Sequence, residues 1–220
     1  MELKYKDYVI EYINTFKMNE PIYLENIRKY VIENIKRIKE DDYDKIYKNI
    51  NVIINRLNKE NYIKTFTKSI YYKPIKNVFG EMPLDKSKII KKKYLKDEDG
   101  NVNGYIAGEK LYYQLGLTTQ IPNMTTIVTN NCDNKYDYIV KSLNIIIRKS
   151  VIDINRFNYK YLQLIDILSN IEKINIDNNN YEKVLYEFIK KNKLSYEKIL
   201  KYIRETNNKR CLDTLLKIAK

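Results

Sequence analysis

The sequence predicts an α+β protein with two domains. Three observations support this prediction: helical and strand patterns share the first 76 residues, a second mixture of both follows residue 103, and helical patterns alone fill the C-terminal part. The length of 220 residues suits two small domains. We therefore expect one domain over residues 1–76, a linker with a short helix over 77–102, and a second domain over 103–220 that ends in a helical bundle.

Three helices are predicted in the first domain. The first has apolar positions at Tyr5, Tyr8, Val9, Tyr12, Ile13 and Phe16, with helical spacing. Pro21 ends this pattern and leaves room for a short strand, after which a second helix carries Leu24, Ile27, Tyr30, Val31 and Ile35. A third helix, capped by Asp42 or Asp44, runs to about Lys59 and buries Ile46, Ile50, Ile53, Ile54 and Leu57.

A β-hairpin is expected directly after the third helix. Residues 62–66 and 70–73 are rich in aromatic and β-branched side chains, the polar turn Thr67-Lys68-Ser69 separates them, and Pro74 ends the second run. Three helices followed by a hairpin make a winged helix-turn-helix, which is the architecture we predict for residues 1–76.

The rest of the chain changes character twice. Residues 78–102 are polar and lysine-rich, and the run Lys91-Lys92-Lys93 is more typical of a solvated surface than of a phosphate contact. From residue 103 we expect a short helix that stops at Gly116, then strands over 124–129 and 143–147. Three or four helices follow from Tyr159, and together these elements form a small α+β domain with C-terminal helices.

Composition argues against most enzyme classes. The chain contains no histidine, its two cysteines lack metal-ligand spacing, and Asp97, Glu98 and Asp99 before Gly100 are typical of a surface turn. We expect no catalytic residue, no metal and no cofactor. With no apolar run of about 20 residues and no signal-peptide pattern, we also expect a cytoplasmic protein that does not contact a membrane.

The positive charge is concentrated in one part of the chain. The net charge is +13, and residues 43–76 carry eight basic and only two acidic side chains, whereas residues 1–42 carry eight and nine. Composition alone explains part of the total, because the residues favoured by A/T-rich codons are abundant throughout. The local excess nevertheless points to a partner with phosphate groups.

The third helix is the predicted DNA-reading element. Opposite its buried side lie Lys48, Asn51, Val52, Asn55 and Lys59. Asn pairs well with adenine in the major groove, so Asn51 and Asn55 are our candidates for base readout. Phosphate contacts are assigned to Lys45, Lys48, Arg56 and Lys59, and the hairpin adds Lys64, Thr67, Lys68 and Tyr71. The alternative is an amphipathic helix with an ordinary solvated face.

Two stretches resemble a known family. NYIKTFTKSIYYKP with VFGEMP, and GYIAGEKLYYQLGLTTQIPNMTTIVTN, are similar to the AbiEi-like antitoxins of type IV toxin-antitoxin systems over roughly residues 40 to 170. The segment from Gly116 to Pro122 is the most specific part. Asn61 and Ser69 stand where the family commonly has glycine; asparagine tolerates a left-handed backbone, and serine tolerates it less well.

The resemblance implies a winged-helix domain that binds operator DNA and represses its own operon. It further implies that residues 100–220 support homodimer contacts or counteract a nucleotidyltransferase-type toxin. We assign Thr118, Thr119 and Gln120 to partner binding, with a helix cap and tight turn as the structural alternative. Two other functions stay open: a stand-alone winged-helix regulator, and a phage-borne module that binds a protein.

Overall fold

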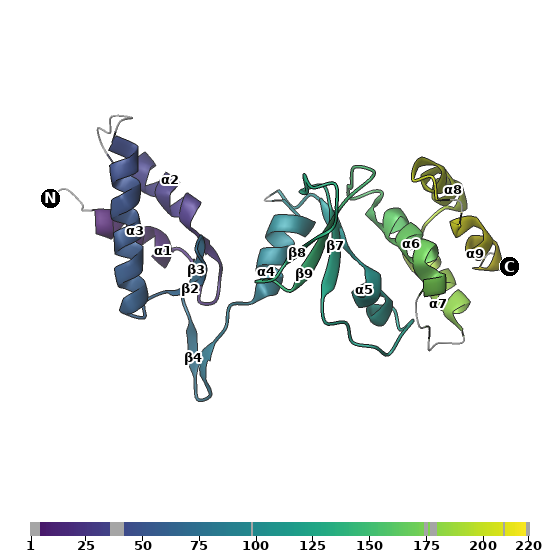
Figure 1. The fold of residues 1–220 in the computed structure, drawn as a ribbon, viewed down its shortest axis with the longest axis horizontal. Helices are drawn as coiled ribbons and strands as arrows, with labels where there is room; N and C mark the ends of the chain where they lie inside the picture. The colour runs from purple at the N-terminus through teal and green to yellow at the C-terminus, as the bar shows by residue number, and fades with distance from the viewer. Residues whose placement is uncertain are drawn as a thin grey trace. The chain divides into compact units, whose positions relative to one another are not determined.

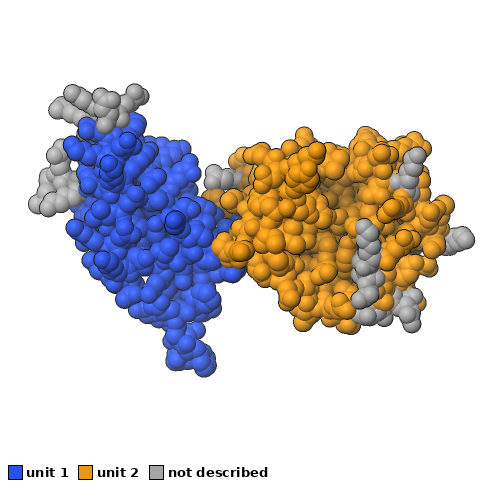
Figure 2. All heavy atoms as spheres, viewed as in Figure 1, with its two compact units in different colours: residues 1–89 blue, residues 90–220 orange. Residues whose placement is uncertain are grey.

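The computed structural model describes residues 5–35, 42–97, 99–173, 176, 180–208 and 210–218. The chain divides into two compact units, residues 1–89 and 90–220 (Figure 2). Each unit has its own apolar core. Both units contain helices and strands, which confirms the α+β class. Among the described helices, none is long and apolar enough to cross a membrane.

The first unit combines three helices with a small antiparallel sheet. Its elements are α1 (Tyr5–Asn14), β1 (Ile22–Tyr23), α2 (Leu24–Asn34), α3 (Tyr43–Lys59), β2 (Lys64–Thr67) and β3 (Ile70–Tyr72). The strands lie in the order β1-β3-β2, and Tyr71 in the central strand pairs with both Ile22 and Thr65. The helices, the short first strand and the hairpin follow one another in the predicted order (Figure 1).

The core of this unit explains the apolar spacing of its helices. Its buried residues are Val9, Ile13, Ile22, Ile27, Val31, Ile46, Ile50, Ile54, Leu57, Ile63 and Tyr71. They come from all three helices and from the sheet, so each helix buries the centre of its predicted stripe, whereas Tyr5 at the start of α1 is 36% exposed. Ile53, which we expected to be buried, is only partly covered and packs at the edge of this core.

The ends of α3 depend on backbone conformation more than on side-chain caps. Asp42 occupies the N-cap position, as expected, but its side chain makes no capping hydrogen bond. After Lys59 the chain turns through Asn61, whose φ of 57° is the left-handed conformation that asparagine tolerates. Ser69 is not among the described residues with positive φ, so the Lys68-Ser69 turn needs no glycine.

A second hairpin lies where the sequence led us to expect a linker. β4 (Ile75–Asn77) pairs with the antiparallel β5 (Gly80–Met82), and the hairpin projects from the first unit (Figure 1). Lys64 Nζ lies 3.2 Å from Glu81 Oε2 and ties the hairpin to β2. The short helix that we expected in this segment is α4 (Lys86–Ile90), and a π-helical turn (Lys91–Leu95) follows it.

The second unit is built on a mixed four-stranded sheet with the order β6-β7-β9-β8. Its strands are β6 (Gly104–Ala107), β7 (Thr125–Thr129), β8 (Tyr138–Val140) and β9 (Ile145–Lys149), and its longer helices are α5 (Gly108–Gln114), α6 (Tyr159–Asn170), α7 (Tyr181–Lys191), α8 (Tyr196–Glu205) and α9 (Cys211–Ile218). The two strands that we predicted correspond to β7 and β9, which are parallel, whereas β6 and β8 were missed.

Three glycines shape the start of this unit. A Cβ at Gly104 would lie 2.2 Å from the Tyr94 carbonyl oxygen and 2.8 Å from that of Val128, so the backbones meet too closely for any side chain. Gly108 begins α5 with a φ of +63°. As predicted, α5 stops at Gly116, whose φ is +72°. All three glycines belong to the stretch GYIAGEKLYYQLGLTTQIPNMTTIVTN.

Candidate functional site

One side of α3 forms a basic surface. Ile46, Ile50, Ile54 and Leu57 are buried on the core side of this helix. Exposed side chains on its other side include Lys45, Lys48, Val52, Asn55, Arg56 and Lys59, and the carboxylate of Asp44 in the first turn of α3 is also exposed. We call Lys45, Lys48, Asn55, Arg56 and Lys59 the α3 surface. Val52 lies among these polar residues, is 49% exposed and offers a ligand a small apolar contact.

The cations of the α3 surface are available to a ligand. Within the described part of the chain, no carboxylate forms an ion pair with Lys45, Lys48, Arg56 or Lys59. Four such positive charges, two near each end of a stretch of about four helical turns, can hold several phosphate groups at once. The geometry therefore suits an extended polyanion better than a single small anion.

Asn51 is held by a residue that sequence reasoning missed. Arg28 on α2 donates from Nη2 to Asn51 Oδ1 at 3.1 Å, and its guanidinium carbon lies 4.7 Å from the centre of the Tyr47 ring. Asn51 is half-buried, whereas Asn55, one turn later, is exposed. No local pattern connects Arg28 with α3, because the contact arises only when the two helices pack. Of the two asparagines, Asn55 is the one that can reach a base edge freely.

The residues predicted in the β2–β3 hairpin have different roles. Lys68 is exposed in the turn, next to the half-buried Thr67. Lys64 is engaged within the protein, with Asn61 Oδ1 at 2.6 Å in addition to Glu81. Tyr71 is a core residue whose hydroxyl donates to the Lys68 carbonyl oxygen at 3.1 Å, and burial raises its pKa. Of these four residues, we therefore keep only Thr67 and Lys68 as candidate contacts, in addition to the α3 surface.

The turn from Gly116 to Pro122 in the second unit borders a groove. The segment after α5 contains Thr118, which is buried, and Thr119 and Gln120, which are exposed. Gln120 donates its backbone N–H to Thr118 Oγ1 at 3.2 Å, so part of the segment is a side-chain-stabilised turn. The groove has a volume of about 660 Å³, and Thr118 and Gln120 line it together with Asp166.

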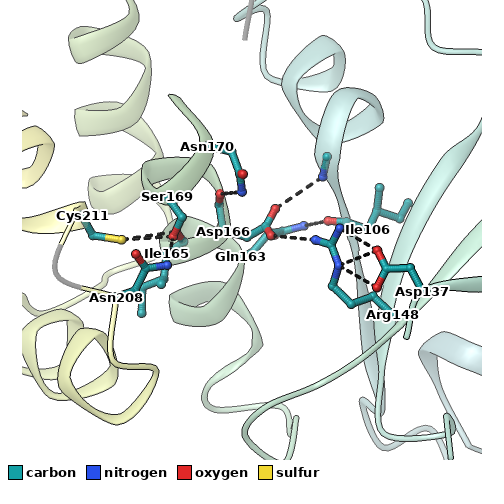
Figure 3. Close-up of polar contacts among 11 residues, drawn as sticks. Ile106, Asp137, Arg148, Gln163, Ile165, Asp166, Ser169, Asn170, Asn208 and Cys211 are labelled. Carbon is teal, nitrogen blue, oxygen red and sulfur yellow. Dashed lines mark hydrogen bonds and ion pairs between the residues drawn. The ribbon is translucent and has the colours of Figure 1, made fainter. Parts of the chain in front are cut away.

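An arginine between two carboxylates lies at this groove (Figure 3). Arg148 of β9 donates to Asp137 from Nε at 3.0 Å and from Nη2 at 2.9 Å, and its Nη1 lies 3.5 Å from Asp166 Oδ1. Gly108 N is 3.4 Å from the other oxygen of Asp166. Burial raises the pKa of Asp166, while Arg148 opposes this effect. We call Asp137, Arg148 and Asp166 the carboxylate–arginine cluster.

The acidic turn after the π-helix is a local structural element. Asp97 accepts hydrogen bonds from the backbone N–H of Asn101 at 2.7 Å and from its side-chain amide at 2.9 Å. These bonds lower the pKa of Asp97. Glu98 lies outside the described residues. Among the residues that the structure describes, no group of three or more carboxylates, cysteines or histidines is arranged to hold a metal ion.

Comparison with known proteins does not assign a function, so the assignment rests on the sequence motifs and on the geometry. No protein-family model matches the chain, and no curated protein and no solved structure is significantly similar to it. The similarity to AbiEi-like antitoxins therefore stays an expectation that rests on the quoted motifs.

Proposed function

We propose that this protein is a DNA-binding transcriptional regulator and that its first unit acts as a winged helix-turn-helix. The single observation that carries the proposal is the α3 surface, with four cations that no described carboxylate neutralises. The order of helices and strands around it supports the same function. In such a domain the exposed face of the third helix enters the major groove.

The residues of this surface divide by role. Lys45, Lys48, Arg56 and Lys59 contact phosphates and set the position of the helix on the duplex. Asn55 reads a base, because its exposed amide offers the donor and acceptor that adenine requires. Lys68 in the hairpin turn adds a phosphate contact beside the helix. DNA is the better partner than a small anion because the charges are spread along the helix.

A salt-titrated binding assay with the full-length protein tests this proposal. Fluorescence anisotropy would compare the DNA upstream of its own gene with an unrelated duplex of equal length. We expect binding to the upstream DNA that is tighter by about 10³-fold or more, and an affinity that falls steeply with salt. The control is Lys183→Ala, which removes an exposed lysine of α7. This variant should change neither the preference for the upstream DNA nor the salt dependence of the affinity. Equal, weak binding to both duplexes would contradict the proposal.

The family resemblance extends the proposal to an antitoxin that represses its own operon. In this extension the second unit counteracts a nucleotidyltransferase-type toxin in the cytoplasm and supports homodimer contacts. The observation that favours a partner-binding role is that the exposed Gln120 lines an open groove, with the buried Thr118 in its wall. Co-expression with the adjacent reading frame tests the extension: rescue of growth supports it, whereas growth arrest that this protein does not relieve favours a stand-alone regulator.

A further inference from the structure

Asp166 is the most enclosed charge of the carboxylate–arginine cluster. Its side chain is 13% exposed, whereas those of Arg148 and Asp137 are 42% and 43% exposed. Gln163, one turn earlier on α6, donates its side-chain amide to the Ile106 carbonyl oxygen at 2.8 Å and fixes the helix against β6 (Figure 3). Asp166 is thereby held between α6 and the sheet, at the wall of the groove.

The hydrogen bonds to this enclosed carboxylate are long. Charge-assisted N–H···O bonds are typically about 2.7–2.9 Å long. Arg148 makes bonds of that quality to the exposed Asp137, but its Nη1 lies 3.5 Å from Asp166, and Gly108 N lies 3.4 Å away. If the cluster served only to tie β9 to α6, the best geometry would belong to the buried partner, since it loses most hydration. The opposite is observed.

On the side of this groove, the described surroundings of Asp166 are acidic within a basic protein, whereas Lys149 and Arg210 line a second pocket with Asp166 and Arg148. Among the described residues that line the groove, Glu109 and Asp166 are acidic and Arg148 is the one cation, and Arg148 is already paired with Asp137. The chain as a whole carries a net charge of +13. At the rim lie Ile121, which is 73% exposed, and Pro122. The groove thus combines an underpaired carboxylate with an apolar edge.

We propose that this groove binds a cationic side chain of a protein partner, with the Asp166 carboxylate as its anchor. An arginine suits the site best. Its planar guanidinium matches a carboxylate with two parallel hydrogen bonds, and its aliphatic stem can lie along Ile121 and Pro122. The inference depends neither on DNA binding by α3 nor on the identity of a toxin.

Three short peptides test the inference on the wild-type protein. NMR titration of the ¹⁵N-labelled full-length chain would use acetyl-Gly-Arg-Gly-amide, the same peptide with neutral citrulline in place of arginine, and the same peptide with glutamate. We expect the arginine peptide to shift the amide signals of Gly108, Gln120 and Asp166 and to bind about tenfold or more tighter than the citrulline peptide. Equal binding of the two, or tighter binding of the glutamate peptide, would overturn the inference.

A pair of variants then assigns the effect to one carboxylate. Asp166→Asn keeps the shape of the side chain and removes its charge, so the preference for arginine over citrulline should disappear. Asp133→Asn is the matched control, because it removes an exposed carboxylate that does not line the groove, and the preference should persist. A preference that survives Asp166→Asn would place the cation elsewhere and contradict the proposal.

Discussion

Asn51 and Asn55 lie one turn apart on α3 but have different surroundings. The Asn51 oxygen accepts a hydrogen bond from Arg28, so a base that used this oxygen would have to displace a guanidinium. Asn55 is exposed. In the sequence the two residues are equivalent candidates, since both lie opposite the apolar stripe. Only the contact between Arg28 of α2 and Asn51 of α3 separates a residue that stabilises the helix pair from Asn55, whose exposed amide is the candidate for a base contact.

Asn55→Ala is expected to relax sequence specificity. A bidentate contact with adenine contributes about 1–3 kcal/mol of discrimination against the wrong base. The variant should lose most of its preference at one position of the operator and retain its affinity for unrelated DNA. Competition binding with single-base operator variants measures this change. An unchanged preference at every position would show that Asn55 does not contact a base.

Lys48→Ala and Lys68→Ala are expected to weaken binding to all sequences about equally. Each lysine is exposed, and a phosphate contact carries no sequence information. Each substitution should lower the slope of log K against log salt by roughly one unit. Lys64→Ala offers a useful contrast, because Lys64 pairs with Glu81 and should leave the slope unchanged. Equal slopes in all four proteins would move the phosphate contacts to another surface.

Asp166 should make stability depend on pH. Burial raises the pKa of Asp166 above its usual 3.8, so the folded protein takes up this proton at a higher pH than the unfolded chain does. As the pH falls from neutral towards 3.8, the wild type should therefore gain stability relative to Asp166→Asn. Denaturant unfolding at several pH values gives this difference. The pKa of Asp97 is lowered, and its contribution to the pH dependence of stability is the same in both proteins, so it does not affect the difference between them.

At the scale of elements, predictions succeeded where a pattern was long. The stripe of α3 spans 17 residues, and the four C-terminal helices repeat apolar positions over several turns each. The β4–β5 hairpin has strands of three residues and places Val78 and Phe79, 93% and 95% exposed, at its tip. Apolar residues in a turn contradict the usual turn chemistry, so this hairpin left no recognisable signal.

Of the two candidate sites, the sequence predicted the one that lies on a single long helix and missed the one that tertiary packing assembles. The α3 surface followed from helix geometry, because every residue that forms it lies on one element. The carboxylate–arginine cluster brings together Asp137, Arg148 and Asp166 from three elements or loops, and β8 and β6 beside it were not predicted. Arg28 and Tyr71 show the same limit, since tertiary packing and not spacing decides what their polar groups contact.

Gly104→Ala is expected to destabilise the second unit strongly. The new Cβ would meet two backbone carbonyl oxygens, at 2.2 and 2.8 Å, and neither can move without disturbing the π-helical turn or β7. We expect a loss of more than about 2 kcal/mol, because overpacking against rigid backbone forces the chain to shift. Gly100→Ala meets open space and is strained only by its φ of +83°, so it should cost about 1 kcal/mol. Thermal unfolding distinguishes the two.

At the scale of the whole molecule, the chain has separate cores. Helices α1, α2 and α3 and the first sheet form the core of residues 1–89, while a cluster centred on α6 joins the C-terminal helices to α5 in residues 90–220. Among the residues that the structure describes, none belongs to both cores. The proposed DNA surface and the proposed cation groove are therefore each supported by a different set of buried side chains.

This separation predicts that a core substitution affects one function and leaves the other intact. Ile54 and Leu164 are 1% and 0% exposed, and replacing either by alanine should cost about 2–5 kcal/mol within its own unit. Ile54→Ala should weaken DNA binding at elevated temperature and preserve the response to the arginine peptide, whereas Leu164→Ala should do the reverse. Calorimetry of both variants gives the matching stability readout, in which each lowers a different transition. A single transition that both variants lower equally would show that the two cores unfold together, and that the two surfaces are coupled through stability.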